Sequence, residues 1–362
     1  MKIGILTNSL DKKTGGGRYA NDLIGGLQAR GHVVVILKEF EDGLPGFAVL
    51  ERGWRLLFCI RKVRVLLSGC DVIHALDGYP SGVIAALANR TLRKRLVITG
   101  QGTYAIAPLY HLNTALLTRY AYRVADRVIT ISHFTKSEIE KKVPNLKNII
   151  VIHPGIDLRA FLQVHDTVGN NKYVVSVGAL KTRKGYNTSI SAYAEVVRKI
   201  PDLEYHIVGN SDSTDRAELE ALAERKHLGG RIHFHRNIPH DELLRLYRGA
   251  LLFVLTPINE NHHVEGFGLV YLEAAASGLP VIGTSGNGGE DAIWPGHNGL
   301  LVPQCDSGAT ARAIIDILSH HELWQQMSTE SINWAKKHSI DDVISRYEEV
   351  YKTIQVQNAL HP

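Results

Sequence analysis

The sequence predicts an α/β protein of two doubly wound domains, and three observations carry this prediction. The chain has 362 residues, more than the roughly 150 residues of one ordinary domain. Short apolar runs alternate with amphipathic stretches along its whole length, as in parallel sheets with helices on both faces. A composition of 44% hydrophobic and 21% charged residues is typical of a globular protein and excludes a disordered, collagen-like or coiled-coil chain.

The first half contains six runs rich in valine and isoleucine that we expect to form strands. They cover residues 2–8, 33–37, 71–75, 96–99, 127–131 and 149–152. Helix-length segments lie between them, at residues 16–30, 52–68, 80–91, 108–125 and 133–142. This alternation predicts one parallel sheet that is covered by helices on both faces.

The second half repeats the pattern, and each of its apolar runs is followed by a helical pattern. The expected strands are 173–177, 204–208, 231–234, 251–255, 280–283 and 300–302. A polar stretch within 157–171 marks the boundary, so we expect domains over 1–165 and 166–340. In the last segment, 341–362, apolar residues recur at steps of three and four and predict an amphipathic helix: Val343, Ile344, Tyr347, Val350, Tyr351 and Ile354.

Membrane spans and secretion signals are not expected. No apolar run approaches the roughly 18 to 20 residues of a span, and residues 1–8 have the pattern of a strand and lack the features of a signal peptide. The three cysteines, Cys59, Cys70 and Cys305, are solitary and form neither a disulfide framework nor a zinc knuckle. A reducing cytoplasm fits this composition best.

Charge is unevenly divided between the two halves. Residues 1–165 contain 23 lysines and arginines against 12 acids, a net charge of +11, whereas 166–362 contain 18 against 24, a net charge of −6. A basic half indicates that one domain meets an anionic surface or substrate. The alternative is chance variation on solvated faces.

The glycine-rich segment 15–20 formally fits the Gly-x-Gly-x-x-Ala pattern of dinucleotide sites. The pyrophosphate turn of such sites follows its strand directly, however, and here residues 9–14 intervene. A loop that lets a ligand approach the carboxyl end of the first strand therefore explains Gly16 and Gly17 better than a dehydrogenase does.

Two carboxylates eight positions apart, Glu265 and Glu273, enclose a loop-to-helix transition after the strand at 251–255. Eight helical residues amount to about 80° beyond two turns, so both acids can address neighbouring parts of one ligand. Gly266 and Gly268 leave backbone N–H groups open at the positive end of the helix, where an anionic diphosphate would bind. The alternative is that Glu265 only caps the helix and Glu273 is solvated.

The segment 265–280 closely resembles the signature of glycosyltransferase family 4, in which seven residues separate two glutamates. The resemblance extends over most of the chain. It includes the first strand with its glycine loop and the segments 71–75, 128–132, 151–157, 177–185, 206–209 and 296–303.

This resemblance implies the GT-B fold, in which two Rossmann-like domains face each other across a cleft and the C-terminal helix crosses back onto the first domain. It implies a retaining, metal-independent hexosyltransferase of polysaccharide biosynthesis. The second domain would hold a nucleotide sugar, GDP-mannose or a UDP-hexose, and the first domain a saccharide or lipid-linked glycan acceptor. No cofactor is expected, and we find neither an Asp-x-Asp motif nor a His/Cys set spaced as metal ligands.

The family's functional positions map onto residues of this sequence. Glu265 would contact the donor sugar, Lys184 would neutralise the diphosphate, and Glu273 would accept hydrogen bonds from the ribose. The remaining expected donor-binding positions are Gly16, Gly17, Gly178, Asn237, Ile238, Gly266, Phe267, Gly268 and Leu269, while His262 and His263 line the sugar or acceptor side or belong to a surface loop.

Two positions depart from the family pattern. Ala179 stands where members commonly have an arginine, and Arg183 or Lys181 in the same loop could replace that phosphate clamp, with Arg183 favoured. Gln101 stands where many members place a histidine beside the donor sugar. Glutamine can hydrogen-bond a hydroxyl group but does not titrate near neutrality.

The basic stretch 52–64 combines Trp54 and Phe58 with several arginines and a lysine. It would suit an interfacial helix on an anionic inner membrane surface, and the alternative is an ordinary sheet-covering helix. No nucleic-acid recognition module is visible. Two other functions stay open from the residues alone: a non-catalytic nucleotide-sugar-binding protein and a nucleotide-sugar epimerase of similar shape.

Overall fold

The structure is a computed structural model that describes residues 1–12, 14–162, 172–210 and 213–359. The chain divides into two compact units. Unit 1 comprises Met1–Gly155 together with Ile340–Pro362, and unit 2 comprises Ile156–Ser339. The chain therefore passes between the units just before the predicted boundary segment 157–171, of which residues 163–171 lie outside the described residues.

Unit 1 contains a seven-stranded parallel sheet with the order β3-β2-β1-β4-β5-β6-β7. Its strands are β1 (Lys2–Thr7), β2 (Val33–Lys38), β3 (Phe47–Ala48), β4 (Val72–Ala75), β5 (Arg95–Gly100), β6 (Arg127–Thr130) and β7 (Ile149–Val151). Its helices are α1 (Gly15–Ala29), α2 (Leu56–Leu67), α3 (Val83–Leu92), α4 (Thr103–Ile106), α5 (Leu112–Val124), α6 (His133–Lys142) and α14 (Ile340–Ala359). The predicted strands are present to within one residue at each end, and only the short β3 was not predicted.

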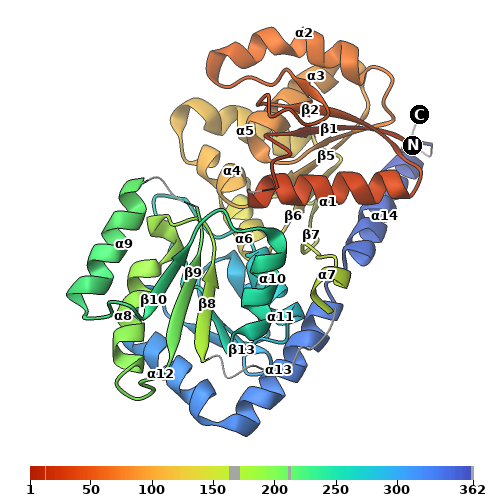
Figure 1. The fold of residues 1–362 in the computed structure, drawn as a ribbon. Coiled ribbons are helices and arrows are strands. Elements are labelled where there is room, and N and C mark those ends of the chain that lie inside the picture. Colours follow the sequence, from red (N-terminus) through yellow and green to blue (C-terminus); the bar gives the residue numbers. More distant parts are fainter. Residues whose placement is uncertain (13, 163–171, 211–212, 360–362) are drawn as a thin grey trace. The chain divides into compact units, whose positions relative to one another are not determined.

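Helix α14 returns from the end of the chain and packs on α1 in unit 1 (Figure 1). Its apolar face is the one that the sequence pattern predicts, with Tyr347 and Tyr351 fully buried. The Tyr351 hydroxyl pairs with Nδ1 of His74 at 2.7 Å, and the other ring nitrogen of His74 pairs with the Thr99 hydroxyl at 2.8 Å. Burial lowers the pKa of His74 to about 3, so this histidine is a neutral structural residue. The predicted return of the C-terminal helix to the first domain is confirmed.

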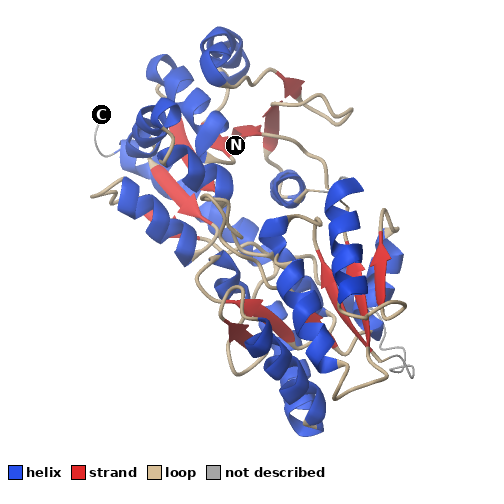
Figure 2. Ribbon diagram, turned by 90° about the vertical axis from the view of Figure 1, so that its left-hand side faces the viewer, coloured by secondary structure: helices blue, strands red, loops and turns tan. Residues whose placement is uncertain are grey.

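Unit 2 contains a six-stranded parallel sheet with the order β10-β9-β8-β11-β12-β13, and helices lie against it (Figure 2). Its strands are β8 (Tyr173–Val177), β9 (Glu204–Val208), β10 (Ile232–His235), β11 (Leu252–Val254), β12 (Val281–Thr284) and β13 (Gly299–Val302). Its helices are α7 (Arg159–Leu162), α8 (Tyr186–Val196), α9 (Ser213–Arg225), α10 (His240–Gly249), α11 (Leu269–Ala276), α12 (Ser307–Ser319) and α13 (His321–Lys336). The predicted architecture, two Rossmann-like parallel-sheet domains, is confirmed.

No helix of the described residues is both long enough and apolar enough to span a membrane.

Candidate active site

The loops at the carboxyl ends of the strands in unit 2 bring together the main predicted residues. A helical turn, η4 (Thr182–Lys184), follows β8, and the segment from 255 to 268 connects β11 to α11. Strands β8 and β11 are parallel neighbours, so both connections leave the sheet at the same edge. Ligands of open α/β sheets bind at this edge.

Lys184, Arg183 and Glu265 form a compact charged group at this edge. The Lys184 ammonium donates to Glu265 Oε2 at 2.5 Å, and Arg183 Nη1 lies 3.6 Å from the same oxygen. Lys184 is 9% exposed and Glu265 is 8% exposed. Burial alone would raise the pKa of the Glu265 carboxyl, but the two cations outweigh burial and lower that pKa, so Glu265 is ionised.

Two glycines allow the backbone segments around this group to approach closely. Gly185 has a φ of 71°, and a Cβ there would lie 1.7 Å from the carbonyl oxygen of Thr256. A Cβ on Gly288 would lie 2.0 Å from the carbonyl oxygen of Gly266. The positions of Lys184 and Glu265 therefore depend on glycine at these two contacts.

Helix α11 begins at Leu269, four residues after Glu265. Gly268 is the N-cap residue of the helix, with a φ of 79°, and it has no side chain that could cap the first N–H groups. The Glu265 carboxylate pairs with Lys184 and Arg183, which is not the helix-capping role that was its alternative. The partial positive charge of α11 adds to that of Lys184 and Arg183, so this part of unit 2 is suited to an anionic group.

Glu273 is buried, with 2% exposure, and accepts a hydrogen bond from the Tyr247 hydroxyl at 3.1 Å. The alternative of a solvated helix residue is therefore wrong. Tyr247 lies on α10 and fixes the carboxylate from a neighbouring helix.

The other predicted residues of unit 2 lie on loops. Gly178 follows β8, and its carbonyl accepts a hydrogen bond from the Tyr186 hydroxyl at 2.8 Å. Asn237 is exposed with a φ of 52°, and its N–H donates to the side chain of Asn210. His262 and His263 are exposed, in a tight turn where His263 pairs with Glu260 through the backbone. The side chain of Phe267 is buried, with 2% exposure, so only its backbone could serve a ligand.

The predicted residues of unit 1 follow the carboxyl ends of β1 and β5. Gly16 and Gly17 form the first turn of α1, and the Gly17 N–H donates to the Thr14 hydroxyl that caps the helix. A Cβ on Gly16 would lie 3.6 Å from the side-chain oxygen of Gln101. Gly16 and Gln101 are therefore neighbours within this unit.

Asp77 is a candidate functional residue that the sequence reasoning missed. It follows β4, is 4% exposed, and accepts the backbone N–H of Gln101 at 3.0 Å. Its φ of 147° and ψ of 163° fall in a region that is essentially restricted to glycine, and such strain concentrates at functional sites. Burial raises the pKa of Asp77 to about 7, although backbone N–H groups and Arg52 oppose the shift. Its position directly after a buried strand was the available sequence signal.

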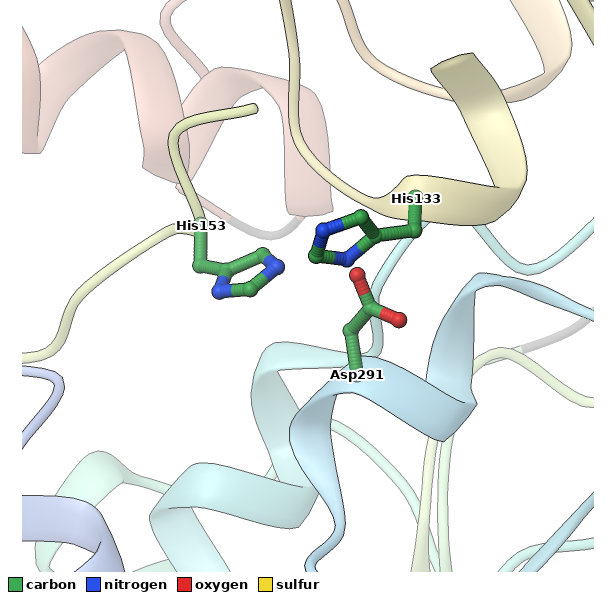
Figure 3. A group of neighbouring side chains, drawn as sticks. All are labelled: His133, His153 and Asp291. Atoms are coloured by element: carbon green, nitrogen blue, oxygen red, sulfur yellow. The ribbon is translucent and has the colours of Figure 1, made fainter. Parts of the chain in front are cut away.

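Two further histidines of unit 1 lie near each other. His133 opens α6, and His153 lies in the loop after β7 (Figure 3). Their rings are 5.3 Å apart at 61° in an edge-on arrangement.

Comparison with known families adds independent evidence. Residues 13–160 match the family described as Glycosyltransferase Family 4, and residues 159–334 match the family described as Glycosyl transferases group 1. The two matches adjoin and together span most of the chain.

Named relatives agree with these matches. The chain is 27% identical over 270 residues to the GDP-mannose-dependent alpha-(1-6)-phosphatidylinositol monomannoside mannosyltransferase of Mycolicibacterium smegmatis, covering 71% of this chain and 69% of the relative. It is 26% identical to the N-acetyl-alpha-D-glucosaminyl L-malate synthase of Bacillus anthracis, covering 78% of this chain and 74% of that enzyme.

Solved structures share the fold. Anabaena HepE in complex with UDP superposes with a TM-score of 0.85 at 20% identity, over 98% of this chain and all of HepE. WaaG, a glycosyltransferase of lipopolysaccharide biosynthesis, superposes with a TM-score of 0.75 at 16% identity, over 96% of this chain and 99% of WaaG. The two parallel-sheet units, the paired glutamates and the family matches lead to one conclusion: the chain belongs to glycosyltransferase family 4 and is a hexosyltransferase of GT-B fold.

Proposed function

We propose that this enzyme transfers a hexose from GDP-mannose or a UDP-hexose to a saccharide or lipid-linked glycan acceptor, with retention of configuration. The observation that carries the proposal is the Lys184–Glu265 pair just before the amino end of α11, where the N-cap residue is Gly268. Relatives point to both donors, since one is named a GDP-mannose-dependent mannosyltransferase and HepE was also crystallised with UDP-glucose.

The donor diphosphate is the group that the cations would hold. Lys184 and Arg183 would lie against its oxygens while the N–H groups of α11 face it, so that the charge of the leaving group is offset without a metal ion. Glu265 would then accept hydrogen bonds from the sugar hydroxyls. Glu273 would accept hydrogen bonds from the ribose of the donor, and the backbone at Asn237 and Ile238 would contact its base.

Transfer would proceed through an oxocarbenium-like transition state. The bond from the anomeric carbon to the diphosphate oxygen breaks, and a bond to the acceptor oxygen forms on the same face. The departing diphosphate takes the proton of the acceptor hydroxyl. Gln101 can orient a hydroxyl on the unit 1 side but cannot exchange a proton near neutral pH.

Donor identity is tested by the thermal stability of the full chain with UDP, GDP, ADP and their sugar conjugates. A ligand at 100 times its dissociation constant stabilises the native state by about 2.7 kcal/mol. We expect one base to raise the melting temperature more than the others, and an equal lack of effect by all of them would contradict the donor site.

Catalysis is tested by Lys184→Ala and Glu265→Ala in a transfer assay that contains EDTA. Each variant should lose at least tenfold in turnover, whereas Lys199→Ala, a change at an exposed lysine elsewhere in unit 2, should remain near the wild-type value. Near-normal turnover of both site variants would refute the assignment. Loss of all wild-type activity in EDTA, restored by Mg²⁺ or Mn²⁺, would refute metal independence. The same assay separates the three candidate functions. A transferase consumes the donor only when the acceptor is present, and an epimerase interconverts nucleotide sugars without any acceptor. A non-catalytic protein binds the nucleotide sugar and does not consume it.

We also propose that the outer face of α2 contacts an anionic membrane surface on the cytoplasmic side. This helix buries one face, yet its Phe58 is 73% exposed and its Val65 71% exposed, and Trp54 in the turn just before the helix is also 73% exposed. Arg61 and Lys62 are exposed on the same segment. An apolar face bordered by cations is typical of interfacial helices, and this pattern supports the proposal over the alternative of an ordinary sheet-covering helix.

Vesicle co-sedimentation at low salt tests the membrane proposal. The wild type should bind phosphatidylglycerol vesicles and not phosphatidylcholine vesicles, and Arg61→Glu/Lys62→Glu should weaken binding at least tenfold, at about 1 kcal/mol per cation. Arg225→Glu/Lys226→Glu, the same change at exposed positions of unit 2, is the matched control. An absence of wild-type binding, or an equal loss in the control, would refute the proposal.

A further inference from the structure

A group of histidines and one glutamate lies on a single face of the sheet in unit 2, on strands β9 and β10. These strands are parallel neighbours, and His206 is directly opposite His233. Glu204 lies two residues before His206, and His235 lies two residues after His233. Alternate residues of a strand share a face, so all four side chains project from the same side of the sheet. Figure 1 shows β8, β9 and β10 side by side.

The distances within this group are those of a ligand set. Glu204 Oε2 lies 3.4 Å from Nε2 of His206 and 3.4 Å from Nε2 of His233, and the three ligand atoms lie within 4.8 Å of one another. Ordinary N–H···O bonds are shorter, at about 2.7–3.2 Å. A tetrahedral zinc ion with bonds of about 2.0–2.1 Å keeps its ligand atoms about 3.3 Å apart.

The Nε2 atom of His233 gives a second indication. It is shielded from solvent and makes no hydrogen bond within the described residues. Glu204 Oε2 lies 3.4 Å away, too far for an ordinary hydrogen bond. A shielded ring nitrogen without a hydrogen bond is costly unless another group uses its lone pair. A cation between His233, His206 and Glu204 would do so.

The ring of His206 is already held in the orientation that a metal ligand needs. Its Nδ1 pairs with Nε2 of His235 at 3.0 Å, which leaves its Nε2 directed at Glu204. Tyr173 stacks on the ring with centroids 4.3 Å apart, and the Tyr173 hydroxyl donates to the carbonyl of Leu246 in α10. Ligating histidines are usually oriented in this way through their second nitrogen.

We propose that unit 2 binds one Zn²⁺ ion through Glu204 Oε2, His206 Nε2 and His233 Nε2, with water as the fourth ligand. Two imidazoles and one carboxylate suit zinc and not the all-oxygen sites of magnesium or calcium. Strand β10 is at the edge of the sheet, so the ion would fasten this edge strand to β9 and stabilise unit 2. None of its ligands belongs to the proposed donor site, and the inference does not depend on the proposed function.

The experiment uses the full chain without an affinity tag, stripped with a chelator and titrated with Zn²⁺ and Co²⁺. We expect one equivalent of zinc to bind, a rise in melting temperature, and the visible absorption of a tetrahedral cobalt site. His233→Phe keeps a ring of similar shape on a strand and should weaken zinc binding at least tenfold. His235→Phe, which alters only the outer partner, should weaken binding less than His233→Phe.

The matched control is His321→Ala, an exposed histidine on α13, which should bind zinc like the wild type. Wild-type protein that binds no stoichiometric zinc would overturn the proposal. So would unchanged binding by His233→Phe, because the ion would then lie elsewhere. Glycosyl transfer measured on His233→Phe keeps the two proposals apart, since loss of zinc binding with transfer retained supports the site and leaves the donor assignment untouched.

Discussion

Replacement of Asp77 by asparagine should stabilise unit 1 in a strongly pH-dependent way. The carboxyl is 4% exposed and accepts the Gln101 N–H through Oδ1. Asparagine has nearly the same shape, keeps an oxygen acceptor, and carries no charge at any pH. The variant therefore isolates the cost of ionising a buried carboxyl.

The magnitude follows from the two pKa values of Asp77. Burial raises the pKa to about 7 in the folded protein, against 3.8 as the reference for the unfolded chain. Between these values the native state keeps a proton that the unfolded chain releases, so the stability from Asp77 is complete below pH 3.8 and is lost as the pH rises through 7. Each pH unit between the two pKa values costs 1.36 kcal/mol of stability, and about two such units lie between pH 5 and the folded pKa of about 7. The loss of stability between pH 5 and pH 8 is therefore about 3 kcal/mol.

Hydrogen exchange of peptides covering β4 and β5 measures this effect within unit 1, after correction for intrinsic exchange rates. The advantage of Asp77→Asn over the wild type should grow by about 3 kcal/mol from pH 5 to pH 8. The neutral His74 is present in both proteins, so its own titration cancels in the comparison.

The control is Asp342→Asn, which removes an exposed carboxyl from α14 of the same unit. Its stability relative to the wild type should not change between pH 5 and pH 8. An advantage of Asp77→Asn that is equal at both pH values would refute the reasoning. Lower stability of the variant at pH 8 would refute it as well, because the carboxylate would then be stabilising.

Two further predictions concern the surroundings of the Lys184–Glu265 pair in unit 2. Lys184→Met should lower the free energy of unfolding in urea by about 3–5 kcal/mol, because it leaves the buried Glu265 carboxylate without its closest partner. The double variant Lys184→Met/Glu265→Gln should lose less stability than the two single variants together, and additive losses would contradict the pairing. Gly185→Ala should lower the melting temperature far more than Gly31→Ala. Both residues have a positive φ, but only a Cβ on Gly185 would meet the Thr256 carbonyl oxygen, at 1.7 Å. Equal losses of melting temperature in the two variants would exclude this clash.

The strand pattern was readable because parallel strands that are buried on both faces leave continuous apolar runs in the sequence. The exception is β3 (Phe47–Ala48), which escaped prediction because it has only two residues and both are exposed. The face by which α14 packs was also readable, since residues three and four apart share one side of a helix. Local periodicity therefore accounts for the elements of both units.

The functional groups depended on the family resemblance or on tertiary structure. Glu265 and Lys184 were predicted only because their surroundings resemble those of family 4, and their 2.5 Å contact joins residues that are 81 positions apart. The backbone strain and the burial of Asp77 cannot be read from the residue types around it, because both depend on the folded structure.

The pairing of His206 with His233 was invisible for a similar reason. Each histidine belongs to an ordinary alternating strand, and only the register of β9 against β10 places them opposite each other. The sequence by itself thus determined which segments form strands and helices, because that information is local. The tertiary structure decided which side chains meet, because strand register and loop packing bring together residues that are far apart in the chain.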